Sequence, residues 1–303
     1  TDGIADVKGS SVLLKTLLEE AAPSVRVDTV QPLQMLSENL TPPLWRNIAE
    51  AVQKGLDDGY KGILITHGSD TLPYTSALLG YLFGGSAKVP IVITAADFPL
   101  SDPRSNGREN IRESAACLQT APPGCYVVWK NPGEKVRRHF ATRLAEAGYI
   151  RDTFSFYGTE AGGTPCTPPP IPENFSFALP FIFMIKNYPG LDYSALQFPE
   201  KKPAAILHTM YHSATGCVTA DARYRLPDFV RRMERLGIPV YGLGFKKGRT
   251  TYAGVPAVLE SGCIPLPLMT AEAALVKLQL AYALCPEAPL PLLHRTWYRE
   301  VLD

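Results

Sequence analysis

The sequence has no long apolar run, almost no net charge and no closely spaced cysteines. None of its apolar stretches approaches the roughly 20 residues that a membrane-spanning helix requires. The formal net charge of +1 offers no basic surface for nucleic acid or an anionic membrane. The first residues, TDGIADVKGSS, lack the basic flank and apolar core of a signal peptide. These features predict a cytoplasmic protein that binds neither nucleic acid nor membranes.

The cysteines and prolines limit the kinds of site and the organisation of the chain. The six cysteines are Cys117, Cys125, Cys166, Cys217, Cys263 and Cys285, and no two form a CxxC pair. In a chain of 303 residues this spacing argues against zinc and against a disulfide scaffold. We therefore expect reduced, mostly buried thiols and no metal or cofactor. Proline-rich stretches at 164–175 (with a GGTP turn at 162–165) and at PEAPLPLL near the end indicate a connector and a tail outside the core.

Apolar residues follow helical and strand patterns in turn along the chain. Helical spacing is found at 11–22, 41–59, 71–85, 106–121, 228–237, 251–262 and 269–284. Short apolar runs typical of buried strands occupy 62–66, 88–96, 124–129, 203–211, 238–245 and 263–267. This alternation predicts an α/β fold with a doubly wound, mostly parallel sheet. We expect a larger N-terminal α/β domain at 1–190 and a smaller C-terminal α/β domain at 200–303.

Polar side chains gather where the strand at 62–66 ends, in the sequence GILITHGSDT. A second polar segment, 94–97, follows the next strand. Ligands of open parallel sheets bind beyond the carboxyl ends of the strands, so the two loops predict a cleft. The alternative is that Ser69 or Asp70 caps the next helix. His67 is expected to hold the turn through its ring nitrogens.

The strand-HGSDT-helix arrangement resembles the HG(T/S)DT motif of the bacterial-type L-asparaginases and glutaminases, closest to their cytoplasmic type I branch. PLQMLSENL resembles the segment with which that family holds the substrate, and VPIVITAADFPLSDPRSNGRENI resembles the strand and loop that follow the motif. GCIPLPLMTAEAALVKLQLA carries a G-x-I-x-x-x-x-M-T-x-E-A-A-L-x-K-L signature near the C-terminus. The resemblance covers nearly the whole chain except about 130–180.

The resemblance implies deamidation of a small amide through a threonine nucleophile, with a Thr-Asp-Lys set that manages protons. Ser69 takes the place of that set's threonine, and Asp70 takes the place of its acid and would also grip the substrate's amino group. Arg143 falls on the lysine, with Lys135 as the alternative register. An arginine can stabilise developing negative charge but cannot relay a proton. The basic run at 134–143 could instead be a solvated face.

The resemblance also implies residues that hold the substrate. Ser37 and Glu38 fall on the pair that holds the α-carboxylate and the amine, and Ala95 would contribute through its backbone. Alternatively, Ser37 and Glu38 are ordinary loop residues ahead of Thr41, the expected cap of the following helix. Glu272 is expected to support the last helix.

One departure from the family concerns the nucleophile. The family's first strand ends in a TGGTI-like motif that supplies the nucleophilic threonine, and a lid with a tyrosine follows it. The sequence begins in residues that resemble the segment after this lid, so we expect an upstream segment that carries both. The resemblance further implies a homodimer or homotetramer.

Four functions stay open on this sequence, one of which is a related amidase that acts on a larger or modified amide. The other three are as follows. The first is an amidohydrolase of the asparaginase type. The second is a catalytically impaired relative that binds an amino acid or serves as an assembly subunit. The third is the amidase subunit of a tRNA-dependent amidotransferase, against which the neutral charge counts.

Overall fold

The computed structural model describes residues 10–150, 153–158, 166–219, 221–246 and 252–302, and it contains two separate four-stranded sheets. The first sheet has the order β1-β2-β3-β4 and consists of β1 (Ile63–Thr66), β2 (Pro90–Thr94), β3 (Gly124–Trp129) and β4 (Arg137–Phe140). The second sheet has the order β10-β9-β8-β7 and consists of β7 (Ile182–Lys186), β8 (Ala205–Thr209), β9 (Val240–Leu243) and β10 (Ile264–Pro265). All neighbours in both sheets are parallel except β3 and β4, which confirms the predicted α/β fold with mostly parallel strands.

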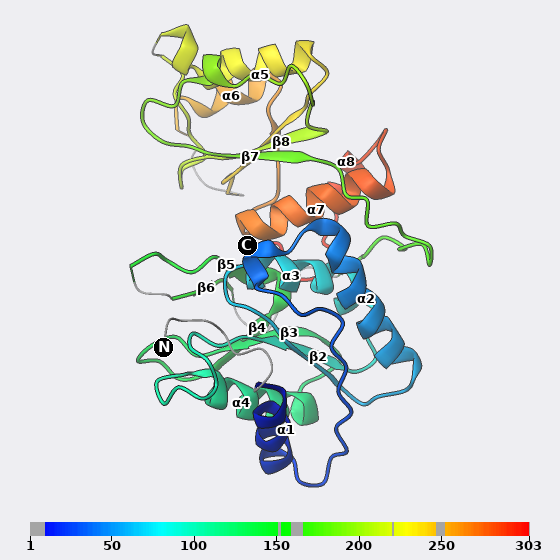
Figure 1. Ribbon diagram of the computed structural model, residues 1–303. Coiled ribbons are helices and arrows are strands. Elements are labelled where there is room, and N and C mark those ends of the chain that lie inside the picture. Colours follow the sequence, from blue (N-terminus) through cyan, green and yellow to red (C-terminus); the bar gives the residue numbers. More distant parts are fainter. Residues whose placement is uncertain (1–9, 151–152, 159–165, 220, 247–251, 303) are drawn as a thin grey trace.

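Helices cover both faces of the first sheet. The helices on one face are α1 (Ser10–Ala21) and α4 (Gly107–Thr120), and those on the other are α2 (Pro42–Asp57) and α3 (Leu72–Leu79), as Figure 1 shows. The central strand β2 is accordingly buried at all five positions. A continuous apolar strand with helices on both faces is what a parallel sheet requires.

The sequence of α2 explains why it forms here. Trp45, Ile48, Ala49 and Val52 are its buried residues, at the spacing of one helical face. Thr41 occupies the N-cap position, as predicted, and a proline follows at the start of the helix. The Trp45 indole N–H donates to Thr75 Oγ1 at 3.0 Å, which fixes α2 against α3.

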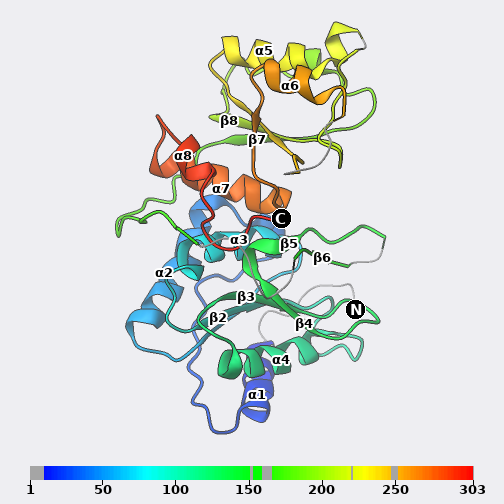
Figure 2. The same ribbon diagram turned by 180° about the vertical axis from the view of Figure 1, so that it is seen from behind.

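Helix α7 (Ala271–Leu284) joins the two halves of the molecule. It lies between α3 and the second sheet in both views, whereas α5 (Leu226–Arg235) and α6 (Val255–Glu260) cover the outer face of that sheet (Figures 1 and 2). Its buried side chains include Val276 and Leu278, which point to opposite sides of the helix. A helix that is apolar all round must be covered all round. A single hydrophobic cluster therefore runs from the first sheet through α3 and α7 to the second sheet.

The proline-rich tail belongs to the core, and the prediction that it lies outside is wrong. Helix α8 (Leu290–Leu293) follows PEAP, and Leu293 and Trp297 are both 0% exposed. Prolines are compatible with the first turn of a helix, where no N–H partner is lost, so a proline cluster does not by itself mark a solvated tail.

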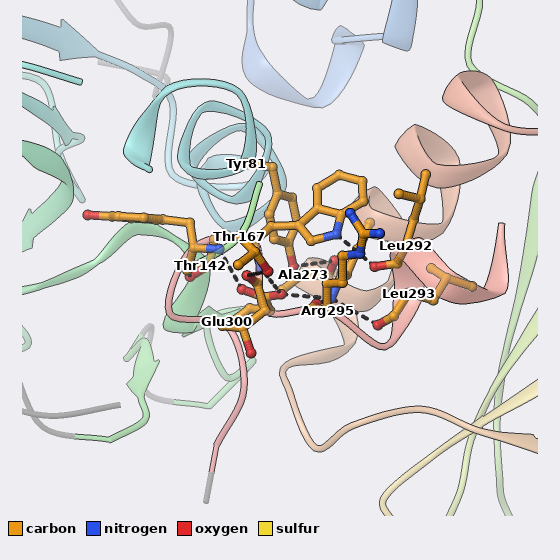
Figure 3. Close-up of polar contacts among 12 residues, drawn as sticks. Tyr81, Thr142, Thr167, Ala273, Leu292, Leu293, Arg295 and Glu300 are labelled. Carbon is orange, nitrogen blue, oxygen red and sulfur yellow. Dashed lines mark hydrogen bonds and ion pairs between the residues drawn. The ribbon is translucent and has the colours of Figure 1, made fainter. Parts of the chain in front are cut away.

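A buried ion pair anchors this tail. The Lys277 ammonium lies 2.7 Å from Glu300 Oε1 and also donates to the carbonyl of Leu293 at 3.0 Å. The same Glu300 carboxylate accepts the backbone N–H groups of Trp297 and Tyr298, each at 2.8 Å. Figure 3 shows these contacts around Glu300. The C-terminal segment is thereby fixed to α7.

Several smaller findings bear on the sequence analysis. All six cysteines are free, three of them buried and three half-buried. Within the described residues, the structure contains no helix long and apolar enough to cross a membrane, and no group of three or more metal-ligating side chains. The GGTP turn at 162–165 lies outside the described residues. The domain division at 1–190 and 200–303 stays a prediction.

Candidate functional site

The loop between β1 and α3 is tied directly to the loop after β2. The His67 backbone N–H donates to the carbonyl of Thr94 at 2.9 Å, which extends the pairing of the two strands beyond their ends. His67 Nδ1 also lies 2.8 Å from the carbonyl oxygen of Gly68, and burial lowers the pKa of the imidazole. The ring therefore stays neutral and holds the turn, as predicted. The two polar loops therefore meet at one edge of the sheet.

Neither Ser69 nor Asp70 caps the helix that follows. The N-cap residue of α3 is Thr71, and no side chain accepts a cap hydrogen bond there. Ser69 is half-buried, whereas Asp70 is exposed. Within the part of the chain that the structure describes, the Asp70 carboxylate forms no hydrogen bond or ion pair. The capping interpretation is therefore wrong, and the carboxylate is available for a ligand.

The segment that carries Ser37 and Glu38 packs on this loop. Ser37 opens a 3₁₀ turn, Ser37–Asn39, and is half-buried, whereas Glu38 on the same turn is exposed. The Thr71 hydroxyl donates to the Ser37 carbonyl at 3.0 Å. On the other side, Gly68 leaves so little room that a Cβ there would lie 2.4 Å from Ser37 Oγ. The structure thus places Ser37 against the loop that carries Ser69 and Asp70, and these three residues are the polar group of the candidate site.

Polar side chains make the neighbouring strand ends rigid. Ala95 is buried, and its carbonyl accepts the side-chain amide of Asn110 at 2.9 Å. Asp97 and Asn106 bind each other reciprocally: the Asp97 N–H donates to Asn106 Oδ1 at 3.1 Å, and the Asn106 N–H donates to Asp97 Oδ1 at 2.9 Å. The Asn106 amide also reaches the carbonyl of Lys130, beyond β3, at 2.8 Å. The loops after three adjacent strands are therefore held in one arrangement.

Arg143 is held by the C-terminal segment. Its side chain is 7% exposed, so the solvated-face interpretation is wrong for this residue. Its Nε donates to the carbonyl of Arg299, and its Nη2 donates to that of Val301 at 3.3 Å. Lys135, the alternative register, is exposed in the connection between β3 and β4. The guanidinium anchors the tail with these donors, and its catalytic role stays a prediction.

Sequence reasoning missed two parts of this region. Thr71 was not singled out, although its hydroxyl ties the Ser37 segment to the loop. Tyr74, Glu146 and Glu272 are also joined by hydrogen bonds, but they lie 72 and 126 residues apart in the chain, and no local pattern signals the contact. The sequence predicts that Glu272 supports the last helix, and the contact with Glu146 is additional to that prediction.

Two cavities in the described residues lie away from this polar group. One of about 350 Å³ lies along β7 and is lined by residues such as Phe183 and Tyr188. The other, of about 380 Å³, lies beside Tyr126 and Tyr298 at the opposite end of the first sheet's strands. Neither is lined by Ser69 or Asp70, so the cleft expected beside these residues stays a prediction.

Comparison with known proteins identifies relatives of this architecture. Residues 5–147 match the family model described as "Asparaginase, N-terminal". The chain is 26% identical over 270 residues to the L-asparaginase of Thermococcus kodakarensis. This alignment covers 84% of this chain and 80% of that protein. It is also 26% identical over 294 residues to a subunit of the glutamyl-tRNA(Gln) amidotransferase of Sulfolobus acidocaldarius. That alignment covers 85% of this chain but only 61% of the relative, so the chain spans about three fifths of its length.

Solved structures share the whole fold. The thermostable L-asparaginase from Thermococcus kodakarensis superposes with a TM-score of 0.73 at 24% identity, covering 94% of this chain and 90% of that one. L-asparaginase I from Vibrio cholerae gives the same TM-score, 0.73, at 21% identity, covering 97% and 92%. At these identities the likeness establishes the fold.

Proposed function

Because this chain belongs to the asparaginase family, we propose that it is an amidohydrolase that converts asparagine or a related small amide to the acid and ammonia. The observation that carries the proposal is the exposed Asp70 carboxylate, which is not committed to α3 and lies in a loop that Thr71 and His67 hold in place. A carboxylate presented in this way binds a substrate ammonium by charge-assisted hydrogen bonds.

The residues around Asp70 are assigned roles that fit their chemistry. We assign the Ser69 hydroxyl to proton transfer beside Asp70. Ser37 and Glu38 hold the amino-acid end of the substrate, and the backbone of Ala95 lines the opposite loop. Arg143 enters only as a fixed positive charge, since an arginine does not release its proton near neutral pH. No described residue is assigned as the nucleophile.

Ammonia release tests this proposal. The natural full-length protein is incubated with L-asparagine and, separately, with L-glutamine, and ammonia is measured over time. Turnover of at least one of these amides is expected. The absence of ammonia from both, with a folded protein, would contradict the proposal.

A second candidate is an assembly subunit that binds an amino acid without hydrolysing it. It is favoured by the relative from Sulfolobus acidocaldarius, which is a subunit of an amidotransferase, and by the arginine at position 143. L-aspartate would then raise the melting temperature while L-asparagine stayed intact. A cytoplasmic location and a homodimeric or homotetrameric state are part of the same proposal for either function.

Replacing Gly68 by alanine is expected to displace Ser37 and to raise KM for asparagine about tenfold, which is a loss of about 1.4 kcal/mol of binding. The reason is steric, because the new Cβ would lie 2.4 Å from Ser37 Oγ and 2.5 Å from Ser37 Cβ. Initial rates at a series of asparagine concentrations measure the change. Gly148→Ala is the matched control, since a Cβ at Gly148 would meet nothing within 4 Å. Equal KM values for the two variants would remove Ser37 from the substrate site.

A further inference from the structure

Three residues from distant segments form a hydrogen-bonded chain beside the candidate site. Tyr74 lies in the first turn of α3, Glu146 directly follows the short strand β5 (Leu144–Ala145), and Glu272 lies in the first turn of α7. The Tyr74 hydroxyl donates to the Glu146 carboxylate. The Glu146 backbone N–H donates to Glu272 Oε1 at 2.8 Å. Glu146 therefore bridges the two helices, with its side chain toward α3 and its backbone toward α7.

The environment of Glu272 is energetically unfavourable for a carboxylate. It is only 6% exposed, and its Oε2 is buried without a hydrogen-bond partner in the described residues. Burial, followed by the nearby charge of Glu146, raises the pKa of the Glu272 carboxyl group. A buried carboxylate oxygen without a partner destabilises the fold, and an apolar side chain would avoid that cost. The core alone does not explain a glutamate here.

The chain of contacts ends on the turn that presents Asp70. Tyr74 is the third residue of α3, and the backbone of this turn is continuous with the loop, because the Leu72 N–H donates to the Ser69 carbonyl at 3.3 Å. At its other end Glu272 lies on a fixed support, since the Thr270 side chain caps α7 by accepting the Ala273 N–H at 3.2 Å. Helix α7 can therefore set the position of the first turn of α3.

We propose that Glu272 is a positioning residue for the amide-binding loop, acting through Glu146 and Tyr74 to hold the first turn of α3 and with it Asp70. The inference rests on the proposed function, which gives Asp70 its ligand. It adds a residue from the C-terminal half of the chain to a site otherwise built from the N-terminal half. In this proposal Glu272 acts through Oε1, which accepts the Glu146 N–H, and the charge of the carboxylate is not required.

This distinction defines the test. Glu272→Leu removes the acceptor, whereas Glu272→Gln removes the charge but keeps an acceptor oxygen in the same place. Tyr74→Phe breaks the other end of the chain. Tyr282→Phe is its matched control, because it removes a tyrosine hydroxyl from the helix that carries Glu272 and, among the described residues, breaks only the contact with the Tyr241 hydroxyl at 3.0 Å. All variants are assayed for ammonia release well below their melting temperatures.

We expect Glu272→Leu and Tyr74→Phe each to lower kcat/KM for asparagine about tenfold, mainly through KM. The double variant should lose no more kcat/KM than the less active of the two single variants, because both changes break the same chain of hydrogen bonds. Glu272→Gln and Tyr282→Phe should stay within about twofold of the wild type, a pattern that a loss of fold stability would not produce. Wild-type activity in Glu272→Leu, or an equal loss in Glu272→Gln, would overturn the proposal.

Amide hydrogen exchange separates this inference from the proposed function. If the wild type hydrolyses neither amide, the proposed function fails, and exchange at residues 70–75 then decides the positioning role. Exchange there should be about tenfold faster in Glu272→Leu and Tyr74→Phe than in Tyr282→Phe. Equal exchange in all three variants would overturn the positioning role on its own.

Discussion

Replacing Asp70 by asparagine is expected to lower kcat/KM for asparagine about 100-fold, which corresponds to about 3 kcal/mol of lost interaction. The reason is that the carboxylate forms charge-assisted hydrogen bonds with the substrate ammonium, and a neutral amide of the same shape cannot replace them. The fold should be unaffected, because Asp70 is exposed and its side chain does not cap α3. Initial-rate kinetics and a thermal melt of the same preparation measure both effects.

Asp58→Asn is the matched control for this change. Asp58 is also an exposed aspartate at a helix end, and its partner is Lys54, 2.9 Å away. An exposed pair of this kind contributes little to stability and nothing to a distant site. Both variants should melt close to the wild type, but only Asp70→Asn should lose activity. Equal activity in the two variants would exclude Asp70 from the reaction.

Replacing Lys277 by methionine is expected to destabilise the fold by about 3–5 kcal/mol, the usual cost of breaking a buried ion pair. The pair is fully enclosed, with side-chain exposures of 1% for Lys277 and 0% for Glu300. Methionine leaves the Glu300 carboxylate buried without its counter-charge, and it also removes a donor from the carbonyl of Leu293. Urea unfolding followed by circular dichroism gives the change in the free energy of unfolding.

Lys54→Met provides the comparison for this substitution. The same chemical change at the exposed Lys54–Asp58 pair should alter the free energy of unfolding by less than about 1 kcal/mol. If Lys277→Met were as stable as Lys54→Met, the tail would not be anchored by the buried pair of Lys277 and Glu300.

The parts of the fold that the sequence predicts are those in which a local pattern decides the structure. The spacing of Trp45, Ile48 and Val52 predicts α2, and the uninterrupted apolar run of β2 predicts a strand covered on both faces. Strand β4 is not predicted by such a local pattern. Its sequence, RRHF, is mostly charged or polar, and it is a strand because it pairs antiparallel with the exposed edge of β3.

The candidate site likewise contains features that the local sequence predicts and features that depend on distant segments. The rule that ligand loops follow parallel strands locates the group of Ser69, Asp70 and the 94–97 loop, because the order of strands brings these ends together. The surroundings of Arg143 depend on a segment 156 residues later in the chain. The contact between Glu146 and Glu272 likewise depends on how α7 packs against the first half of the molecule. Periodicity and motifs carry no information on such pairings.

The central claim is that the Asp70 carboxylate faces the amino group of an amino-acid ligand. The most direct test titrates the wild type and Asp70→Asn with L-aspartate and with succinate, which has the same carbon chain and carboxylates but no amine. Isothermal calorimetry should show the wild type binding aspartate at least tenfold more tightly than succinate, and Asp70→Asn binding the two about equally. A variant that keeps the wild-type preference for aspartate would contradict the account.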